Sequence, residues 1–347
     1  MRPIPSLDGI RAASFAIVFL SHLTIHTIPG DFGVTVFFFL SGFLITTLLR
    51  VEYERTGRVN LPAFWLRRAL RILPPFYLVW AALVIAAPRL YSPEVLDWPS
   101  IRAQLLFYAN YWGIYGVNRE MPGTGVVWSL AVEEHFYLLF PWLFLGLRML
   151  KLPPARQALV LFSLCGLVLL WRCVLITAFA VQGDRIYSAT DTRFDSLLFG
   201  CALAVWRNPA LDPPLASVAE WRRLWIPLAL TLLILSNLWR DSLLWSSFCF
   251  SIQGLALMLA FSAAIRFPQW LLFRPLNAGL VRAIGVLSYT LYLVHVIILK
   301  ALLRLWPDAS GLKRAAAALM LSIAAAALMY LAVERPCAAL RRRLAPA

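Results

Sequence analysis

The sequence predicts an all-α fold: a polytopic bundle of transmembrane helices that forms one integral membrane domain over residues 1–347. Two observations predict it. Hydrophobic residues make up 61% of the chain and charged residues only 14%, whereas soluble proteins are about half apolar and about a quarter charged. The apolar residues also gather into about ten runs, each close to the ~20 residues that a helix needs to cross a bilayer. Little sequence remains for a water-soluble domain, so nucleic-acid binding is not the default explanation of the net charge of +15.

The runs, taken in chain order, give the expected spans. The first run follows Arg2, and Asp8 and Arg11 interrupt it with no small-residue cleavage site after it. It is therefore expected to be a retained helix rather than a signal peptide. The third follows a basic stretch that ends at Pro74, and the fourth opens at Trp128. The spans are expected near residues 8–28, 31–49, 72–90, 128–147, 157–180, 193–207, 224–240, 247–265, 284–304 and 314–333.

The basic residues between the spans predict the orientation. If the N-terminus is cytoplasmic, the cytoplasmic segments hold 20 Lys and Arg residues and the outer segments hold 9. Cytoplasmic loops of membrane proteins carry such an excess. Both termini and residues 50–71 are therefore expected to face the cytoplasm. The long segment 89–127 is expected to face outside, where its aromatic residues are typical of an interfacial belt.

The first span carries ionisable residues, which are costly at membrane depth and are usually retained for a function. Arg11 and His22 are eleven residues apart, or ~1100° of helix rotation, so they share one face. Taken singly, Arg11 is explained by a pair with Asp8, and His22 by a hydrogen bond to a neighbouring carbonyl. His22 and His26 also have the spacing of metal ligands. No further His or Cys pattern supports a metal site, however, and the five cysteines lack zinc spacing, so no metal is expected.

Two adjacent carboxylates, Glu133 and Glu134, lie in the first turns of the fourth span, where the helix dipole stabilises anions. Adjacent residues on a helix point ~100° apart, so only one of them can face a central cavity. We expect that glutamate to lie near His22 and to form the His/carboxylate pair that general base catalysis uses. The alternative is an interhelical salt bridge, for example to Arg193 at the outer end of the sixth span.

A basic stretch with Arg67, Arg68 and Arg71 precedes Pro74 at the predicted inner membrane face. Arg68 and Arg71, at positions i and i+3, share a helical face and can bind phosphates through bidentate hydrogen bonds. Ordinary positive-inside anchoring explains the same arginines. The residues alone leave both interpretations open.

Six motifs follow one another along almost the whole chain. They are Leu7-Asp8-Gly9-Ile10-Arg11 followed by His22; Gly33-Val34 with Phe38-Phe39-Leu40-Ser41-Gly42-Phe43-Leu44; Arg67-Arg68 to Pro74; Trp128-Ser129-Leu130 with Glu133-Glu134 and Phe136-Tyr137; Ser288-Tyr289-Thr290-Leu291-Tyr292-Leu293 with His295; and Glu334-Arg335-Pro336. Through them the sequence resembles the membrane-bound acyltransferase 3 family. The resemblance implies transfer of an acyl group, usually acetyl, from acyl-coenzyme A (acyl-CoA) to a hydroxyl of a carbohydrate or glycosylated acceptor, such as a polysaccharide of the cell envelope.

The implied chemistry assigns roles to the candidate residues. A hydroxyl is a weak nucleophile until a base takes its proton, and we expect His22 to be that base or a transient acyl carrier. One glutamate is expected to orient it, and Arg11 to act on the donor side. The expected catalytic residues are His22, Glu133, Glu134 and Arg11; the donor-binding residues are Arg67, Arg68 and Arg71; and the acceptor-binding residues are Asn110, Trp112, Trp128, Arg193, Asp195 and His295.

The resemblance also implies partners and a location. Acyl-CoA is expected as a co-substrate, with no tightly bound cofactor. The chain is expected in the lipid bilayer of a bacterial inner membrane, as a stand-alone member without the C-terminal soluble SGNH-type domain of some relatives. Any second, external transfer would then need a partner protein. Two other classes stay open: a transporter or flippase of a lipid-linked sugar, which also uses intramembrane Arg, His and Glu, and a non-catalytic membrane sensor.

Overall fold

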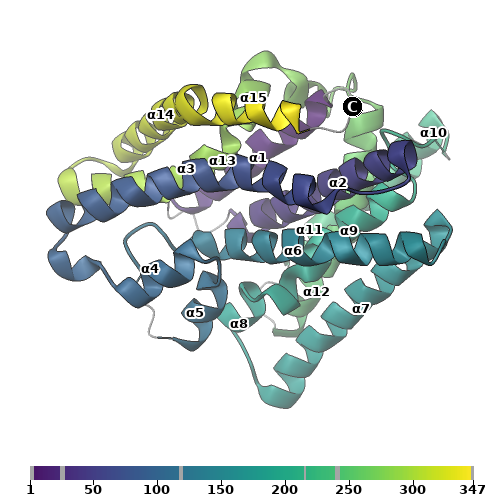
Figure 1. The fold of residues 1–347 in the computed structure, drawn as a ribbon, viewed down its shortest axis with the longest axis horizontal. Helices are drawn as coiled ribbons and strands as arrows, with labels where there is room; N and C mark the ends of the chain where they lie inside the picture. Colours follow the sequence, from purple (N-terminus) through teal and green to yellow (C-terminus); the bar gives the residue numbers. More distant parts are fainter. Residues whose placement is uncertain (1–3, 24–27, 117–119, 215, 239–242, 345–347) are drawn as a thin grey trace.

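The computed structural model describes residues 4–23, 28–116, 120–214, 216–238 and 243–344, and within these ranges it is built from helices and has no β-strand (Figure 1). The predicted all-α fold is confirmed. The ten longest helices in these ranges are α1 (Pro5–Ser21), α2 (Gly30–Thr56), α3 (Leu61–Leu90), α6 (Val127–Met149), α7 (Pro154–Phe179), α9 (Thr190–Val205), α11 (Ile226–Leu238), α12 (Leu243–Arg266), α13 (Gly279–Leu305) and α14 (Gly311–Met329). Shorter elements are η1 (Pro93–Val95), α4 (Trp98–Leu105), α5 (Ala109–Tyr115), α8 (Asp184–Tyr187), α10 (Val218–Glu220), η2 (Trp221–Trp225), η3 (Arg274–Asn277), η4 (Tyr330–Glu334) and α15 (Arg335–Arg343).

Each of the ten predicted spans falls on one of these ten helices. Seven of the described helices are long and apolar enough to cross a membrane. The helices α1, α9 and α11 are shorter, with 17, 16 and 13 residues, and so fall below the ~20 residues of a typical crossing. The exact number of crossings therefore stays a prediction.

The structure corrects the start of the third predicted span. Helix α3 begins at Leu61, not near residue 72, and the side chain of Asn60 caps it by accepting a backbone hydrogen bond of 3.0 Å. The helix then continues through Pro74 and Pro75. Proline is tolerated inside transmembrane helices because neighbouring groups satisfy the backbone carbonyls that it frees. The basic stretch is therefore part of one long helix rather than a segment before it.

Interhelical hydrogen bonds gather the predicted cytoplasmic segments at one end of the bundle. Arg50, near the end of α2, binds the carboxylate of Asp212 in the loop after α9 at 2.6 Å. Arg266, at the end of α12, donates to the backbone carbonyl of Asp212 at 3.0 Å. Arg67, in the first turns of α3, donates to the carbonyl of Leu344, just after α15, at 2.9 Å. These segments lie together as the predicted topology requires, whereas the side of the membrane that they face stays a prediction.

The packed core lies around α2, α6 and α9. Phe39 and Phe43 of α2, Phe136 of α6 and Leu197 of α9 are fully buried. A Cβ atom at Gly42 of α2 would collide with the backbone of Leu197, so glycine permits this close helix contact. Helices α7 and α14, at the edges of the bundle in Figure 1, have few buried residues, as is expected of helices that face lipid.

Helix α1 packs equally closely on α13. Gly285 of α13 faces the backbone carbonyl of Asp8 in α1, and a Cβ atom there would collide with it. Small residues at such crossings let two backbones approach. This contact fixes α1, which carries Arg11 and has His22 as its C-cap, against the helix that carries His295. The helix thus ends at Ser21, earlier than the first predicted span.

Candidate active site

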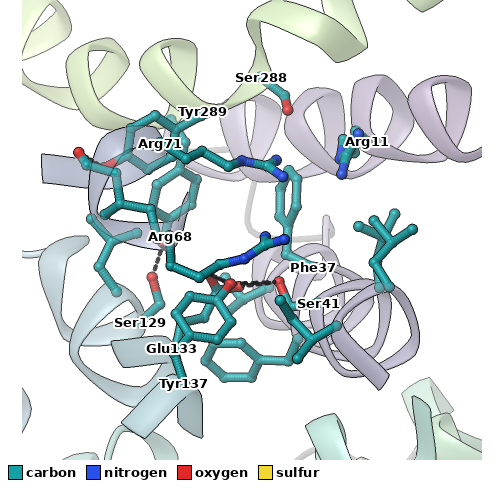
Figure 2. Close-up of a pocket in the computed structure, with 18 residues that line it drawn as sticks. Arg11, Phe37, Ser41, Arg68, Arg71, Ser129, Glu133, Tyr137, Ser288 and Tyr289 are labelled. Atoms are coloured by element: carbon teal, nitrogen blue, oxygen red, sulfur yellow. Dashed lines mark hydrogen bonds between the residues drawn. The ribbon is translucent and has the colours of Figure 1, made fainter. Parts of the chain in front are cut away.

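A polar cavity, which we call the inner cavity, lies between α1, α2, α3, α6 and α13. It holds about 730 Å³ of space free of protein atoms, part of it open to the surroundings. Figure 2 shows Arg68 and Arg71 reaching into it from α3, with Arg11 of α1 opposite them. Its polar lining residues are Arg11, Ser41, Arg68, Arg71, Ser129, Glu133, Tyr137, Ser288, Tyr289 and Tyr292.

Glu133 is the acidic residue in the wall of the inner cavity. One carboxylate oxygen accepts a hydrogen bond of 2.8 Å from the Ser41 hydroxyl, and the other accepts one of 2.9 Å from the Tyr137 hydroxyl (Figure 2). Arg11 binds Asp8 at 2.9 Å, as the alternative interpretation of the sequence expects, and its side chain also lines the cavity. Glu133 is thus held in place by two hydroxyls rather than by an arginine.

Positive charge exceeds negative charge in the inner cavity. Arg68 and Arg71 form no hydrogen bond or ion pair with any residue in the described ranges. The Nε atom of Arg68 is buried without a partner there, and its guanidinium carbon lies 5.8 Å from the ring centre of Phe64. Both arginines are half-buried, and a cation that is partly removed from water and forms no ion pair is costly, at membrane depth above all. The cavity therefore favours an anionic ligand.

A second cavity, which we call the outer cavity, contains His22. It holds about 1070 Å³ of space free of protein atoms, part of it open. Its polar and aromatic lining residues are Ser21, His22, Asp31, Trp128, Tyr187, Tyr292 and Lys300. A polar cavity with an imidazole in its wall suits a hydroxyl-bearing ligand.

The position of His22 leaves one ring nitrogen available. Its Nδ1 lies 2.8 Å from the backbone carbonyl oxygen of Val18. In the tautomer that donates this hydrogen bond, Nε2 carries a lone pair and can accept a proton. The ring of His295 meets the ring of His22 edge-on, with the ring centres 5.1 Å apart. The second histidine of the proposed metal spacing, His26, lies outside the described residues.

The two cavities meet at Val34 and Tyr292, which line both. The hydroxyl of Tyr292 lies 2.7 Å from the Ser129 hydroxyl and donates to the carbonyl of Val126 at 3.2 Å. Tyr292 is therefore fixed at the boundary. Val34 and Tyr292 therefore lie between the cavity that contains Arg68 and Arg71 and the cavity that contains His22.

Comparison with known sequences shows to which protein family the chain belongs. The profile of the acyltransferase 3 family, described as "Acyltransferase domain", matches residues 4–334. The chain belongs to this family. The match covers nearly the whole chain, and the resemblance carried by the six motifs is confirmed.

Curated relatives agree with this membership of the acyltransferase 3 family. The peptidoglycan O-acetyltransferase OatA of Listeria monocytogenes is 35% identical over 223 residues, which are 60% of this chain and 35% of the relative. A putative O-acetyltransferase of Staphylococcus aureus is 34% identical over 226 residues, or 62% of this chain and 37% of the relative. The O-acetyltransferase OatA of Staphylococcus aureus is 35% identical over 221 residues, or 60% and 36%.

The aligned region spans only about a third of the length of each of these relatives. The comparison therefore shows the membrane acyltransferase family, and the acceptors named for the relatives belong to those proteins. No solved structure gives a significant match to this acyltransferase-family chain.

The structure does not bring the expected histidine and carboxylate of this family member together. Glu133 lies in the inner cavity and His22 in the outer cavity. The group that orients His22 is the Val18 carbonyl within its own helix. Glu134, the neighbour of Glu133, does not line the inner cavity and interacts electrostatically with Arg68. The expectation that only one of the two glutamates faces a cavity agrees with this arrangement.

The donor-side arginines separate into two groups. Arg68 and Arg71 line the inner cavity, but Arg67 does not. Arg67 binds the carboxylate of Glu52 at 2.9 Å and the carbonyl of Leu344 at 2.9 Å. These two contacts join α3 to α2 and to the end of α15. Arg67 therefore has a structural role that the sequence did not predict.

Two of the expected acceptor residues lie on α9 and differ in their surroundings. Asp195 is fully buried and uses both carboxylate oxygens on Arg172 of α7. Arg193 is also fully buried and donates to the Thr35 hydroxyl at 2.9 Å, not to a glutamate as the salt-bridge alternative expects. Aromatic rings surround its guanidinium group: Phe38, Trp128, Tyr187 and Phe250. Both oxygens of Asp195 thus bind Arg172, and Asp195 lines neither cavity.

Of the other expected acceptor residues, one lines the outer cavity and three do not. Trp128 lines the outer cavity. Asn110 is buried and donates to Thr190 at 3.0 Å, and Trp112 donates to Ser100 at 3.0 Å, so both hold the segment between α3 and α6 in place. His295 is fully buried and does not line the outer cavity, but its ring contacts those of His22 and Tyr292, which do.

Some residues of the site were missed by the sequence prediction. Tyr137 follows Glu133 by four residues on one helix face, and this spacing alone places its hydroxyl near the carboxylate. Ser41 and Tyr292 lie within motifs that were recognised, but their contacts with Glu133 and Ser129 join different helices. Helical spacing predicts neighbours within a helix, and it says nothing about such pairs.

The two glutamates give a matched pair of variants. Glu133→Gln is expected to lower turnover roughly tenfold or more, because hydrogen bonds to a charged group are worth about 1.5–3 kcal/mol and the amide accepts them less well. Glu134→Gln, on the next residue but outside the cavity wall, is expected to keep turnover within about twofold of the parent. Acyl-transfer turnover of the purified proteins in nanodiscs measures both. Equal and small losses would remove Glu133 from the active site.

Proposed function

We propose that the protein transfers an acyl group, in the simplest case acetyl, from acyl-CoA to a hydroxyl of a carbohydrate acceptor of the cell envelope. One observation carries the proposal: a cavity with the unpaired cations Arg68 and Arg71 adjoins a cavity in which His22 presents a free nitrogen. A polyphosphorylated donor suits the first cavity, and a hydroxyl acceptor that needs a base suits the second. Membership of the acyltransferase family supports the same reaction.

The residues of the two cavities support a balanced reaction. Nε2 of His22 takes the proton of the acceptor hydroxyl while its oxygen forms a bond to the thioester carbonyl carbon. The C–S bond then breaks, and the CoA sulfur receives the proton from His22. The Val18 carbonyl, hydrogen-bonded to Nδ1, holds the tautomer and stabilises the imidazolium form. In a second route Nε2 of His22 forms a bond to the thioester carbonyl carbon and the C–S bond breaks, which leaves CoA thiolate and an acyl-imidazolium. The acceptor oxygen then forms a bond to the acyl carbon, the C–N bond breaks, and the hydroxyl proton goes to the CoA sulfur, which restores neutral His22.

For the acceptor we propose a chemical class, a glycan of the cell envelope, and not a single molecule. The relative from Listeria monocytogenes is named for peptidoglycan O-acetylation, and a glycan acceptor fits the open outer cavity with Trp128 and Tyr187 in its wall. Mass spectrometry of the cell-envelope glycans of a deletion strain is expected to show the loss of an O-acyl group. An unchanged glycan pattern, together with transport of a lipid-linked sugar without release of CoA, would favour the flippase instead.

The donor site is tested by binding. Arg68→Ala and Arg71→Ala are each expected to weaken CoA binding by about 1.5–3 kcal/mol, the range for hydrogen bonds to charged groups. Lysine at either position is expected to restore only part of the affinity, because it lacks the bidentate fork of arginine. Isothermal titration of the detergent-solubilised protein measures this.

Arg89→Ala is the matched control for the donor site. Arg89 lies at the far end of the same helix, and its side chain donates to the backbone carbonyl of Ile85. Its removal is expected to leave CoA affinity at the parental value. If both cavity variants bind CoA like the parent, the arginines of α3 serve only as a membrane anchor.

A further inference from the structure

A basic groove lies beside the inner cavity, between the end of α2, the start of α3 and the C-terminal helix α15. It holds about 1080 Å³ of space free of protein atoms, part of it open. Its charged lining residues are Glu52, Arg55, Arg67, Arg68, Arg341 and Arg342. Arg68 also lines the inner cavity, so the groove and the cavity adjoin at this side chain.

The single carboxylate in the groove wall is already neutralised. Glu52 binds Arg67 at 2.9 Å through one oxygen and accepts the backbone N–H of Asn60 at 2.8 Å through the other. Arg67 uses its remaining terminal nitrogen on the carbonyl of Leu344, at the end of α15. Arg67 and Glu52 therefore hold α15 against α3, and Glu52 has no oxygen directed at Arg68, Arg341 or Arg342.

Arg341 and Arg68 share a feature on the two sides of the groove. The Nε atom of each is buried and has no hydrogen-bond partner within the described part of the chain. Arg342, the neighbour of Arg341 on α15, also lines the groove. Glu334 attracts Arg341 electrostatically, but its carboxylate accepts its hydrogen bond from the Thr290 hydroxyl. Guanidinium groups with unfilled hydrogen bonds are suited to phosphate, which accepts several charge-assisted hydrogen bonds at once.

We propose that α15 forms one wall of the site for the phosphorylated nucleotide end of the donor, with Arg341 and Arg342 as phosphate ligands. The proposal rests on the proposed acyl-CoA reaction and assigns a part of the donor to a part of the chain. The phosphates lie in the groove, and the acyl-bearing arm passes Arg68 into the inner cavity toward Val34 and Tyr292. The ion pair between Glu52 and Arg67, together with the hydrogen bond from Arg67 to the Leu344 carbonyl, positions α15.

Binding of CoA and of adenosine 3′,5′-bisphosphate, which keeps two of the three phosphate groups of CoA and lacks the acyl-bearing arm, tests the proposal. Arg341→Ala and Arg342→Ala are each expected to weaken both ligands about tenfold or more. Arg343→Ala is the matched control, because Arg343 lies on the same helix but does not line the groove. Its affinity is expected to equal that of the parent. Arg341→Lys is expected to recover part of the loss, which unfolding of α15 would not allow.

The outcomes separate this proposal from the function on which it rests. If the parent binds CoA and the Arg341→Ala and Arg342→Ala variants bind it equally well, the role of α15 is overturned and the proposed reaction stands. If the parent binds neither CoA nor the bisphosphate, the proposed role of α15 and the proposed acyl-CoA reaction are both overturned. Measurement in nanodiscs of phosphatidylcholine and of phosphatidylglycerol covers the other source of phosphate. Variants that change only the retention of phosphatidylglycerol would assign the groove to lipid headgroups and overturn the proposal.

Discussion

Replacement of His22 by alanine or glutamine is expected to lower acyl transfer at least ~100-fold, because general base catalysis contributes on that scale or more. The affinity for CoA is expected to stay near the parental value, since His22 lines the outer cavity and the unpaired arginines line the inner one. Turnover of purified protein with acetyl-CoA and a glycan acceptor, both saturating, measures the first effect. Titration with CoA measures the second.

The control for His22 is its neighbour in the sequence, His26, for which we expect a much smaller effect of alanine. A His22→Ala protein that turns over at a substantial rate under saturating conditions would refute the assignment of the base. The same protein distinguishes the two routes of transfer. The parent and the His22→Ala variant are incubated with labelled acetyl-CoA in the absence of acceptor. If His22 carries the acyl group, the parent becomes labelled and His22→Ala does not. If His22 acts only as a base, neither protein becomes labelled.

The sequence predicted those features that depend on neighbours along one helix. Runs of apolar residues located all ten long helices, and the spacing of Arg68 and Arg71 placed both in one cavity wall. Arg11 and His22 were expected on one face of α1, and each does line a cavity. They line different cavities, however, because eleven residues also correspond to ~16 Å of rise along the helix.

Features that depend on contacts between helices were not predictable in this way. The expected pairing of His22 with a glutamate was argued from similar depth in the membrane, and depth does not fix the direction in which a side chain points. Glu133 instead meets Ser41 of α2. The contact of Arg67 with Leu344 joins residues far apart in the chain, and no spacing rule links them.

A buried ion pair between α7 and α9 is the clearest case of such a contact. Arg172 and Asp195 are both fully buried, and two hydrogen bonds of 2.9 and 2.7 Å join them. The guanidinium group has five N–H donors. The remaining three bind the carbonyls of Ser247 and Thr192 and the hydroxyl of Ser251. The Ser251 hydroxyl donates in turn to Asp195, so the cluster satisfies every donor of Arg172.

Removal of one member of this pair is expected to destabilise the protein strongly. Arg172→Ala or Asp195→Leu leaves an uncompensated charge inside the bundle, which costs about 3–5 kcal/mol. The double variant Arg172→Met/Asp195→Leu removes both charges with little change in volume, and it is expected to recover most of that loss. Unfolding of the detergent-solubilised protein, followed by tryptophan fluorescence, measures all three. If Asp195→Leu keeps the parental stability and loses only affinity for the glycan acceptor, Asp195 binds substrate, as the sequence suggested. A loss of stability that the double variant repairs shows instead that the pair holds α9 in place and, with it, the aromatic cage around Arg193.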